Sequence, residues 1–161
     1  PELVIHRLLA AARSRVDTAE EKDTQENQAL NEIKNLMAGL LDLESPDSFT
    51  LTPTGIKVTG HWGTSELSEL SDGYQSVINW VLDLLSWWFL RENGKSRWEL
   101  SSLRGIVLID EIEQHLHPKW QRAIFPRLRE KFPNIQFIVA THSPLVATAN
   151  PDIDVHLLNK W

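Results

Sequence analysis

The chain has 161 residues, a net charge of −6 and no cysteine. This length supports one domain with a hydrophobic core, and the lack of cysteine excludes a disulfide framework and a thiolate metal site. The negative charge argues against a broadly basic nucleic-acid surface, and no segment has the pattern of a secretory signal or a membrane span. We therefore expect a cytoplasmic protein with no membrane partner.

Residues 1–47 are predicted to form a helical region. Apolar residues recur at helical spacing in residues 1–16 and again in residues 29–43. Residues 17–28 between them are almost wholly polar, which is typical of a solvated helix or a mobile linker. The turn-forming sequence Ser-Pro-Asp closes this region, so we place a boundary there, before a second region of residues 48–161.

The second region is predicted to begin with a β-hairpin. Apolar and polar residues alternate in residues 49–52 and 56–59, and Pro-Thr-Gly lies between these two runs. Trp62 near the end of the hairpin is expected to pack on neighbouring structure. Stacking of Trp62 on an adenine ring is the less favoured alternative, because an isolated tryptophan more often serves packing.

A long helix is predicted over residues 73–92. Apolar residues cover most of its circumference, so we expect it to be buried on several sides. Three aromatic residues near its end are expected in the core, and contact with a second chain or with a missing lobe is the alternative. These residues are Trp87, Trp88 and Phe89.

The start of this helix has features of an anion site. Ser71 or Asp72 can serve as the N-cap, and Gly73 allows close approach of another backbone. The N-terminus of a helix is favourable for anions, because its first N–H groups have no intrahelical partner.

Two short apolar runs end at chemically active side chains. Residues 105–111, Gly-Ile-Val-Leu-Ile-Asp-Glu, predict a fully buried strand of a parallel sheet that ends at Asp110 and Glu111. Two carboxylates at the end of a buried strand are costly unless a cation lies there, and in nucleotide hydrolases that cation is Mg²⁺. A second strand, residues 137–140, leads into His142, at a position where open α/β sheets bind ligands.

The remaining elements complete an α/β pattern. Residues 91–104 are predicted to be a polar connection, and residues 118–131 a helix that begins at Pro118. A final strand is predicted over residues 153–158. Helices therefore alternate with buried strands, which indicates a layered α/β fold.

Four motifs in this order resemble those of ABC-type ATPases of the SMC, RecF and OLD-like branch, and of the related AAA-type ATPases of prokaryotic defence systems. Leu-Ser-Asp-Gly-Tyr-Gln resembles the signature motif, and Asp110-Glu111 resembles Walker B with the catalytic glutamate. Glu-Gln-His-Leu-His-Pro at residues 113–118 is similar to the D-loop, and His142 to the switch histidine. The resemblance covers residues 48–158. It implies the C-terminal lobe of a P-loop NTPase, with a mostly parallel sheet and flanking helices.

The resemblance also implies a site for ATP and Mg²⁺. Asp110 would orient the metal, Glu111 would act as general base on water, and His142 would reach the γ-phosphate. In this family the signature contacts nucleotide held by the opposite subunit of a dimer, and the D-loop lies along the interface. The residues concerned are Ser71, Asp72, Gly73 and Gln75 in the signature and His115, Leu116 and His117 in the D-loop.

The signature departs from the family at Asp72, where transporters have glycine. A carboxylate that faced a triphosphate would be unfavourable, so we infer that Asp72 points away and caps the helix. The D-loop-like segment has another interpretation, a metal site at Glu113, His115 and His117. That alternative is disfavoured, because the spacing matches no zincin motif.

The chain contains no Gly-x-x-x-x-Gly-Lys-Ser/Thr sequence. Without that Walker A loop, no backbone nest cradles the phosphates and no lysine reaches them. We therefore expect this chain to be the C-terminal part of a longer ATPase, inactive on its own and completed by a missing N-terminal lobe. A degenerate relative that binds no nucleotide is the alternative.

The predicted function is ATP binding and hydrolysis by a head that dimerises around ATP. Such a head is expected to drive a nucleic-acid-directed or anti-phage defence machine, with nucleic acid or an effector subunit as a further partner. Two alternatives remain open. One is a non-hydrolysing interaction lobe, and the other is the ATPase part of an OLD-like nuclease system.

Overall fold

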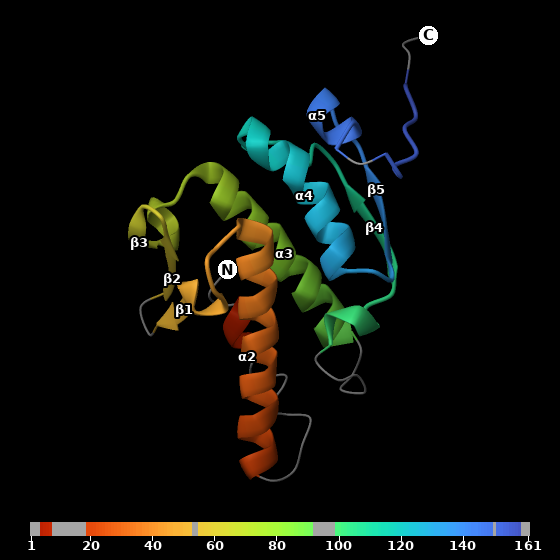
Figure 1. The fold of residues 1–161 in the computed structure, drawn as a ribbon. Coiled ribbons are helices and arrows are strands. Elements are labelled where there is room, and N and C mark those ends of the chain that lie inside the picture. The colour runs from red at the N-terminus through yellow and green to blue at the C-terminus, as the bar shows by residue number, and fades with distance from the viewer. Residues whose placement is uncertain (1–3, 8–18, 53–54, 92–98, 150, 159–161) are drawn as a thin grey trace.

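The computed structural model describes residues 4–7, 19–52, 55–91, 99–149 and 151–158 (Figure 1). Residues 4–7 are helical, and a three-stranded antiparallel sheet and a two-stranded parallel sheet lie among the helices that follow. In chain order the elements are α2 (Ala19–Leu41), β1 (Phe49–Thr52), β2 (Gly55–Gly60), β3 (Gly63–Glu66), α3 (Asp72–Arg91), β4 (Gly105–Ile109), α4 (Pro118–Lys131), β5 (Ile135–Val139) and α5 (Pro144–Ala147). Short 3-10 turns occupy Pro46–Ser48, Leu67–Glu69 and Leu100–Ser102. The predicted α/β class is confirmed.

Helix α2 is longer than the apolar pattern alone predicts. Residues 19–28 belong to this helix, so for them the helix is confirmed and the linker is wrong. The helix ends in a Schellman motif, in which Asp42 has a φ of 61° and the Leu43 N–H donates to the Ala38 carbonyl at 3.0 Å. Arg127 of α4 fixes this end, since it donates to the Leu40 carbonyl at 2.9 Å and pairs with Asp42 at 2.7 Å.

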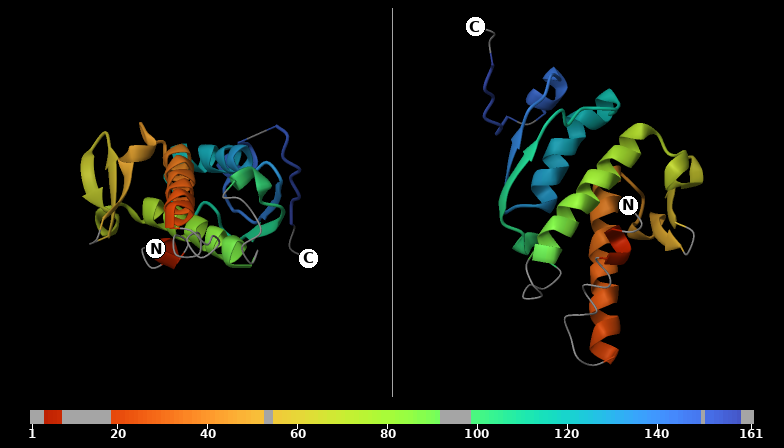
Figure 2. Two further views of the ribbon diagram at one scale, coloured as in Figure 1. Left: turned by 90° about the horizontal axis from the view of Figure 1, so that it is seen from below. Right: turned by 180° about the vertical axis from the view of Figure 1, so that it is seen from behind.

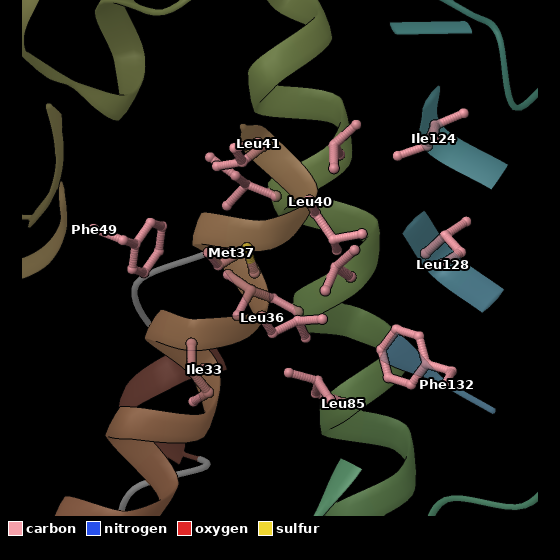
Figure 3. Packing of buried hydrophobic residues seen from close by; sticks show 14 of the residues in the cluster. Ile33, Leu36, Met37, Leu40, Leu41, Phe49, Leu85, Ile124, Leu128 and Phe132 are labelled. Carbon is pink, nitrogen blue, oxygen red and sulfur yellow. The ribbon is translucent and has the colours of Figure 1, made fainter. Parts of the chain in front are cut away.

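The hydrophobic core lies around α3. Figure 3 shows Leu36 and Leu40 of α2 on one side of α3, and Ile124 and Leu128 of α4 on the other. Leu85 of α3 lies between these two groups, and all of these side chains are buried. The prediction of a central helix buried on several sides is therefore confirmed. The proposed division of the chain at residue 47 stays a prediction.

The hairpin is confirmed and has a third strand. Strands β1 and β2 pair antiparallel, from Phe49 opposite Val58 to Thr52 opposite Gly55. Strand β3 continues the sheet on the other side of β2. Its sequence, Gly-Thr-Ser-Glu, has no apolar alternation, so the sequence pattern missed it. The backbone ladder and a 2.9 Å hydrogen bond between the hydroxyls of Thr59 and Thr64 hold it against β2.

Strands β4 and β5 are parallel, but they are not fully buried as predicted. On one face Phe137 packs edge-on against Phe125 and Phe132 at the α4 side, with ring centroids 6.3 and 6.2 Å apart. On the other face Ile106 is 64% and Leu108 75% exposed. Side chains alternate between the faces of a strand, and among the described residues helices cover one face only. Figure 2 shows this sheet at the margin of the molecule, opposite β1–β3.

Two further predictions are wrong. Residues 153–158 do not form a strand, because within the described part of the chain they find no neighbour for a backbone ladder. Trp87 is 70% exposed and so lies outside the core, whereas Trp88 is half-buried and packs against it. The side chain of Phe89 and residues 92–98 of the polar connection lie outside the described residues. No helix in the described part is both long and apolar enough to cross a bilayer.

Candidate functional site

The carboxyl ends of β4 and β5 lie at the same edge of the parallel sheet. Ile109 stands opposite Val139, and the Ala140 N–H donates to the Ile109 carbonyl at 2.8 Å, which carries the ladder one residue further. The two loops that leave this edge begin at Asp110 and at Thr141. The structure therefore brings together the two motifs that the sequence separates by about thirty positions, where open α/β sheets bind ligands.

The side chains expected to act on nucleotide are exposed at this edge. Asp110, Glu111 and His142 are all open to solvent. Among the described residues, neither the Asp110 nor the Glu111 carboxylate forms a hydrogen bond or an ion pair. Glu111 has a φ of 49°, in the left-handed region that non-glycine residues rarely adopt and that is common at functional sites. Both carboxylates are thus free to take a ligand.

Glu113 joins the two loops. One of its carboxylate oxygens accepts from the His142 backbone N–H at 2.6 Å, and the other accepts from the Thr141 hydroxyl at 2.5 Å. Burial raises the pKa of Glu113, but hydrogen bonds from Thr141, from its own N–H and from His142, with the nearby charge of His142, hold the pKa below its ordinary value. Glu113 is therefore a carboxylate with both oxygens engaged inside the chain.

Gln121 of α4 makes a second connection between the same loops. Its amide N–H donates to the Leu116 carbonyl at 2.9 Å, and its amide oxygen accepts from the Ser143 hydroxyl at 2.7 Å. Ser143 is 8% exposed and also accepts from the Leu145 N–H as the N-cap of α5. No sequence signal pointed to Gln121, because its partners are distant in the chain and its own position looks like any polar site on a helix.

The D-loop-like segment turns sharply between β4 and α4. His115 is exposed and has a φ of 63°, while Leu116 is buried in the core of this chain. His117 is exposed and caps α4, since its Nδ1 accepts from the Lys119 N–H at 3.3 Å. Leu116 thus anchors the segment, and the two histidine side chains remain at the surface.

The signature-like segment lies directly against this turn. A methyl group on Gly73 would lie 2.7 Å from the His115 carbonyl oxygen, so the close approach expected of this glycine is confirmed. Ser71 and Asp72 are exposed at the start of α3. The Gln75 side chain donates to the Leu70 carbonyl at 2.8 Å and so closes the turn that leads into the helix.

An aromatic row extends from the hairpin to α4. The Tyr74 ring lies 5.2 Å from that of Trp62 and 4.5 Å from that of Trp120, centroid to centroid. The expected packing role of Trp62 is therefore confirmed. These rings border a surface hollow of about 280 Å³ beside Asp42. Burial raises the pKa of Tyr74, and Asp42 raises it further, while Arg127 acts against this rise.

The alternative of a metal site in the D-loop-like segment finds no support. The carboxylate of Glu113 binds Thr141 and His142, and the ring of His117 turns to the Lys119 N–H. In the portion of the chain that is described, no three His, Asp or Glu side chains gather as metal ligands would.

Comparison with a family model gives a match over residues 6–148, to the family AAA_21, described as "AAA domain, putative AbiEii toxin, Type IV TA system". The Septu protein PtuA of Bacillus mycoides (strain KBAB4) is 45% identical over 94 residues, which are 58% of this chain and 12% of that protein. The Retron Vc95 probable ATPase of Vibrio cholerae is 57% identical over 56 residues, or 35% of this chain and 11% of that protein. This chain therefore matches only about a tenth of the length of these relatives.

Among solved structures, the SMC head domain from Thermotoga maritima has a similar fold. The TM-score is 0.51 at 22% sequence identity, and the match covers 77% of this chain and 41% of that domain. At this level of identity the likeness concerns the fold, which is that of a P-loop NTPase.

Proposed function

We propose that this chain, which belongs to the AAA_21 family of AAA domains, is part of an ATP-hydrolysing head that drives a prokaryotic defence machine. The observation that carries the proposal is the shared edge of β4 and β5, from which Asp110, Glu111 and His142 are all presented to solvent. The names of the relatives, a Septu protein and a retron ATPase, are in keeping with this assignment.

Each of the three residues has a role that suits its chemistry. The carboxylate of Asp110 is the kind of hard oxygen ligand that Mg²⁺ prefers, and bound Mg²⁺ would neutralise charge on the phosphates of ATP. Glu111 would accept a proton from the attacking water. His142 would donate a hydrogen bond to the γ-phosphate. The absence of protein partners for Asp110 and Glu111 among the described residues supports these roles.

The signature would act on nucleotide held by a second copy of the protein. Ser71 and Asp72 are exposed at the start of α3, where unpaired N–H groups favour an anion. Gly73 and Gln75 would shape this turn, through the contact with His115 and the bond to Leu70. In the resulting homodimer around ATP, the segment of His115, Leu116 and His117 would lie at the interface. The exposure of Asp72 supports its outward orientation. The predicted capping role of Asp72 is not met, because α3 begins at Asp72 and the Ser71 carbonyl accepts from the Gln75 N–H at 3.2 Å, which places Ser71 at the N-cap.

Another part of a longer protein would supply the phosphate-binding loop. The uncovered sheet face, formed by Ile106, Leu108 and Ile138, is apolar and 50–75% exposed, and such faces are normally covered. The chain also matches only about a tenth of its relatives' length. An N-terminal lobe that carries Walker A would cover this face, and the segment alone would then be inactive. The complete machine is proposed to act in the cytoplasm on nucleic acid or through an effector subunit.

The test is Glu111→Gln in the full-length protein, with Glu130→Gln as the control on an exposed turn of α4. Loss of a general base should lower the hydrolysis rate by roughly 10²–10⁴-fold, and the variant should accumulate as an ATP-bound dimer in size-exclusion chromatography with light scattering. Hydrolysis at the wild-type rate would rule out Glu111 as the base. A wild-type protein that binds no ATP would favour the non-hydrolysing interaction lobe instead.

A further inference from the structure

Glu113 differs from the two acids before it. Asp110 and Glu111 face solvent, whereas Glu113 is half-buried and uses both carboxylate oxygens inside the chain. Its two partners lie 28 and 29 residues further along the sequence, in the loop that presents His142. A carboxylate occupied in this way is poorly suited to accept a proton from water, but it is well suited to hold a loop.

The bonds of Glu113 are of a strong type and fix orientation as well as distance. Both have an ionised acceptor, which makes them shorter and about twice as strong as bonds between neutral groups. Thr141 cannot turn away without a loss, because its hydroxyl oxygen also accepts from the Ser143 N–H at 3.0 Å. The backbone at His142 is therefore held from its own N–H and from the preceding side chain.

Gln121 holds the next residues of the same loop. It connects Leu116 and Ser143, and α4 gives it a rigid support. The loop after β4 and the loop after β5 are thus tied at two points, by Glu113 at the near end and by Gln121 at the far end. Ser143 would remain in place without Glu113, whereas the His142 backbone N–H would lose its carboxylate partner.

We propose that Glu113 is a positioning residue, which holds the His142 loop against the loop that follows β4 and so fixes where His142 stands relative to Glu111. The contact itself follows from the geometry alone, and its effect on catalysis rests on the function proposed above. Glu113 touches no reacting atom in this scheme and acts through His142.

The first arm of the test measures the contact and needs no catalysis. In the full-length protein, hydrogen–deuterium exchange of the peptide containing residues 140–143 should become about tenfold faster in Glu113→Ala, since the His142 N–H loses its charge-assisted bond. Exchange in β1 and β2 should not change. The matched control is Glu130→Ala, which removes an exposed carboxylate that pairs with the neighbouring Lys131. Unchanged exchange at residues 140–143 in Glu113→Ala overturns the proposal.

The second arm measures the effect on ATP turnover. Glu113→Ala should lower kcat on the order of ten- to a hundredfold and leave KM nearly unchanged, because displacement of a catalytic group affects the transition state most. Glu113→Gln, which keeps an acceptor for the His142 N–H, should recover most of this loss. Faster exchange combined with a wild-type kcat overturns the positioning role.

A third pair of variants separates positioning from general damage to the fold. Thr141→Val removes the hydroxyl at nearly constant shape, and it should lower kcat less than Glu113→Ala does. Adding Thr141→Val to Glu113→Ala should slow the enzyme by less than Thr141→Val does alone, because both changes break the same bond between Glu113 and Thr141. Fully additive losses overturn the proposal. If the wild-type protein does not hydrolyse ATP, the proposed function fails, and the exchange arm still decides the contact.

Discussion

Gly73 lies against the carbonyl oxygen of His115, so closely that a methyl group on Gly73 would stand 2.7 Å from that oxygen. The start of the signature-like helix and the turn after β4 are therefore in direct backbone contact within one chain. A movement of the turn must therefore also displace the start of α3, since a backbone carbonyl cannot rotate away as a side chain can.

Gly73→Ala should destabilise the fold. Overpacking against a backbone atom costs about 1–3 kcal/mol, which outweighs the gain of about 1 kcal/mol in helix propensity. Urea denaturation followed by circular dichroism would measure the change in unfolding free energy. Asn79→Ala, at an exposed position on the same helix, should leave that free energy equal or slightly higher. A Gly73→Ala protein as stable as the wild type would show that the turn at His115 can shift to make room for the methyl group without loss of stability.

Tyr74 should ionise at a higher pH in the folded than in the unfolded protein. It is the only tyrosine among the 161 residues, so absorbance at the phenolate band reports it alone. Its folded pKa is raised, first by burial and then by Asp42. The associated stability is therefore present below the unfolded pKa of about 10 and is lost as pH rises through the folded pKa. Asp42→Asn should move the titration back towards lower pH, and an unchanged midpoint would contradict the contribution of Asp42.

His117→Ala should weaken the start of α4. Removal of an N-cap acceptor costs about 0.5–2 kcal/mol, and the long bond of 3.3 Å places His117 near the lower limit. His117→Asn should restore the stability or exceed it, because asparagine is among the preferred N-caps. Thermal unfolding of the three proteins would test this order. Equal stability of the alanine and asparagine variants would mean that the cap contributes nothing.

Leu108 and Leu128 offer a matched pair of leucines. Leu128 is fully buried between α3 and α4, so Leu128→Ala should cost about 2–5 kcal/mol. Leu108 is largely exposed in this chain, and Leu108→Ala here should change the unfolding free energy by less than about 0.5 kcal/mol. In a full-length protein with a lobe over this face, Leu108→Ala should become clearly destabilising. An equally small effect there would argue that the face stays uncovered.

Motifs with strong local chemistry could be predicted from the sequence. The helix at Pro118, the hairpin around Pro-Thr-Gly and the strand that ends at Asp110 depend on nearby residues, and each was found. The parallel direction of the sheet was also predicted, whereas the direct pairing of β4 with β5 is seen only in the structure.

What the sequence could not supply depends on distant neighbours. Residues 153–158 have a strand pattern, but a strand exists only where another backbone lies beside it. Trp87 is an aromatic residue of the kind that is common in cores. Its exposure, however, depends on which face of α3 the other helices cover. The role of Gln121 depends on two loops that meet only after folding.

The contacts of Tyr74 with Trp62 and Trp120 allow intrinsic fluorescence to report whether these three rings stay packed. At centroid separations of 5.2 and 4.5 Å, a tyrosine passes its excitation energy to tryptophan almost completely. Fluorescence from Tyr74 should therefore be undetectable as long as the hairpin, α3 and α4 stay packed together. Its appearance would signal that the row has opened, without any label attached to the molecule.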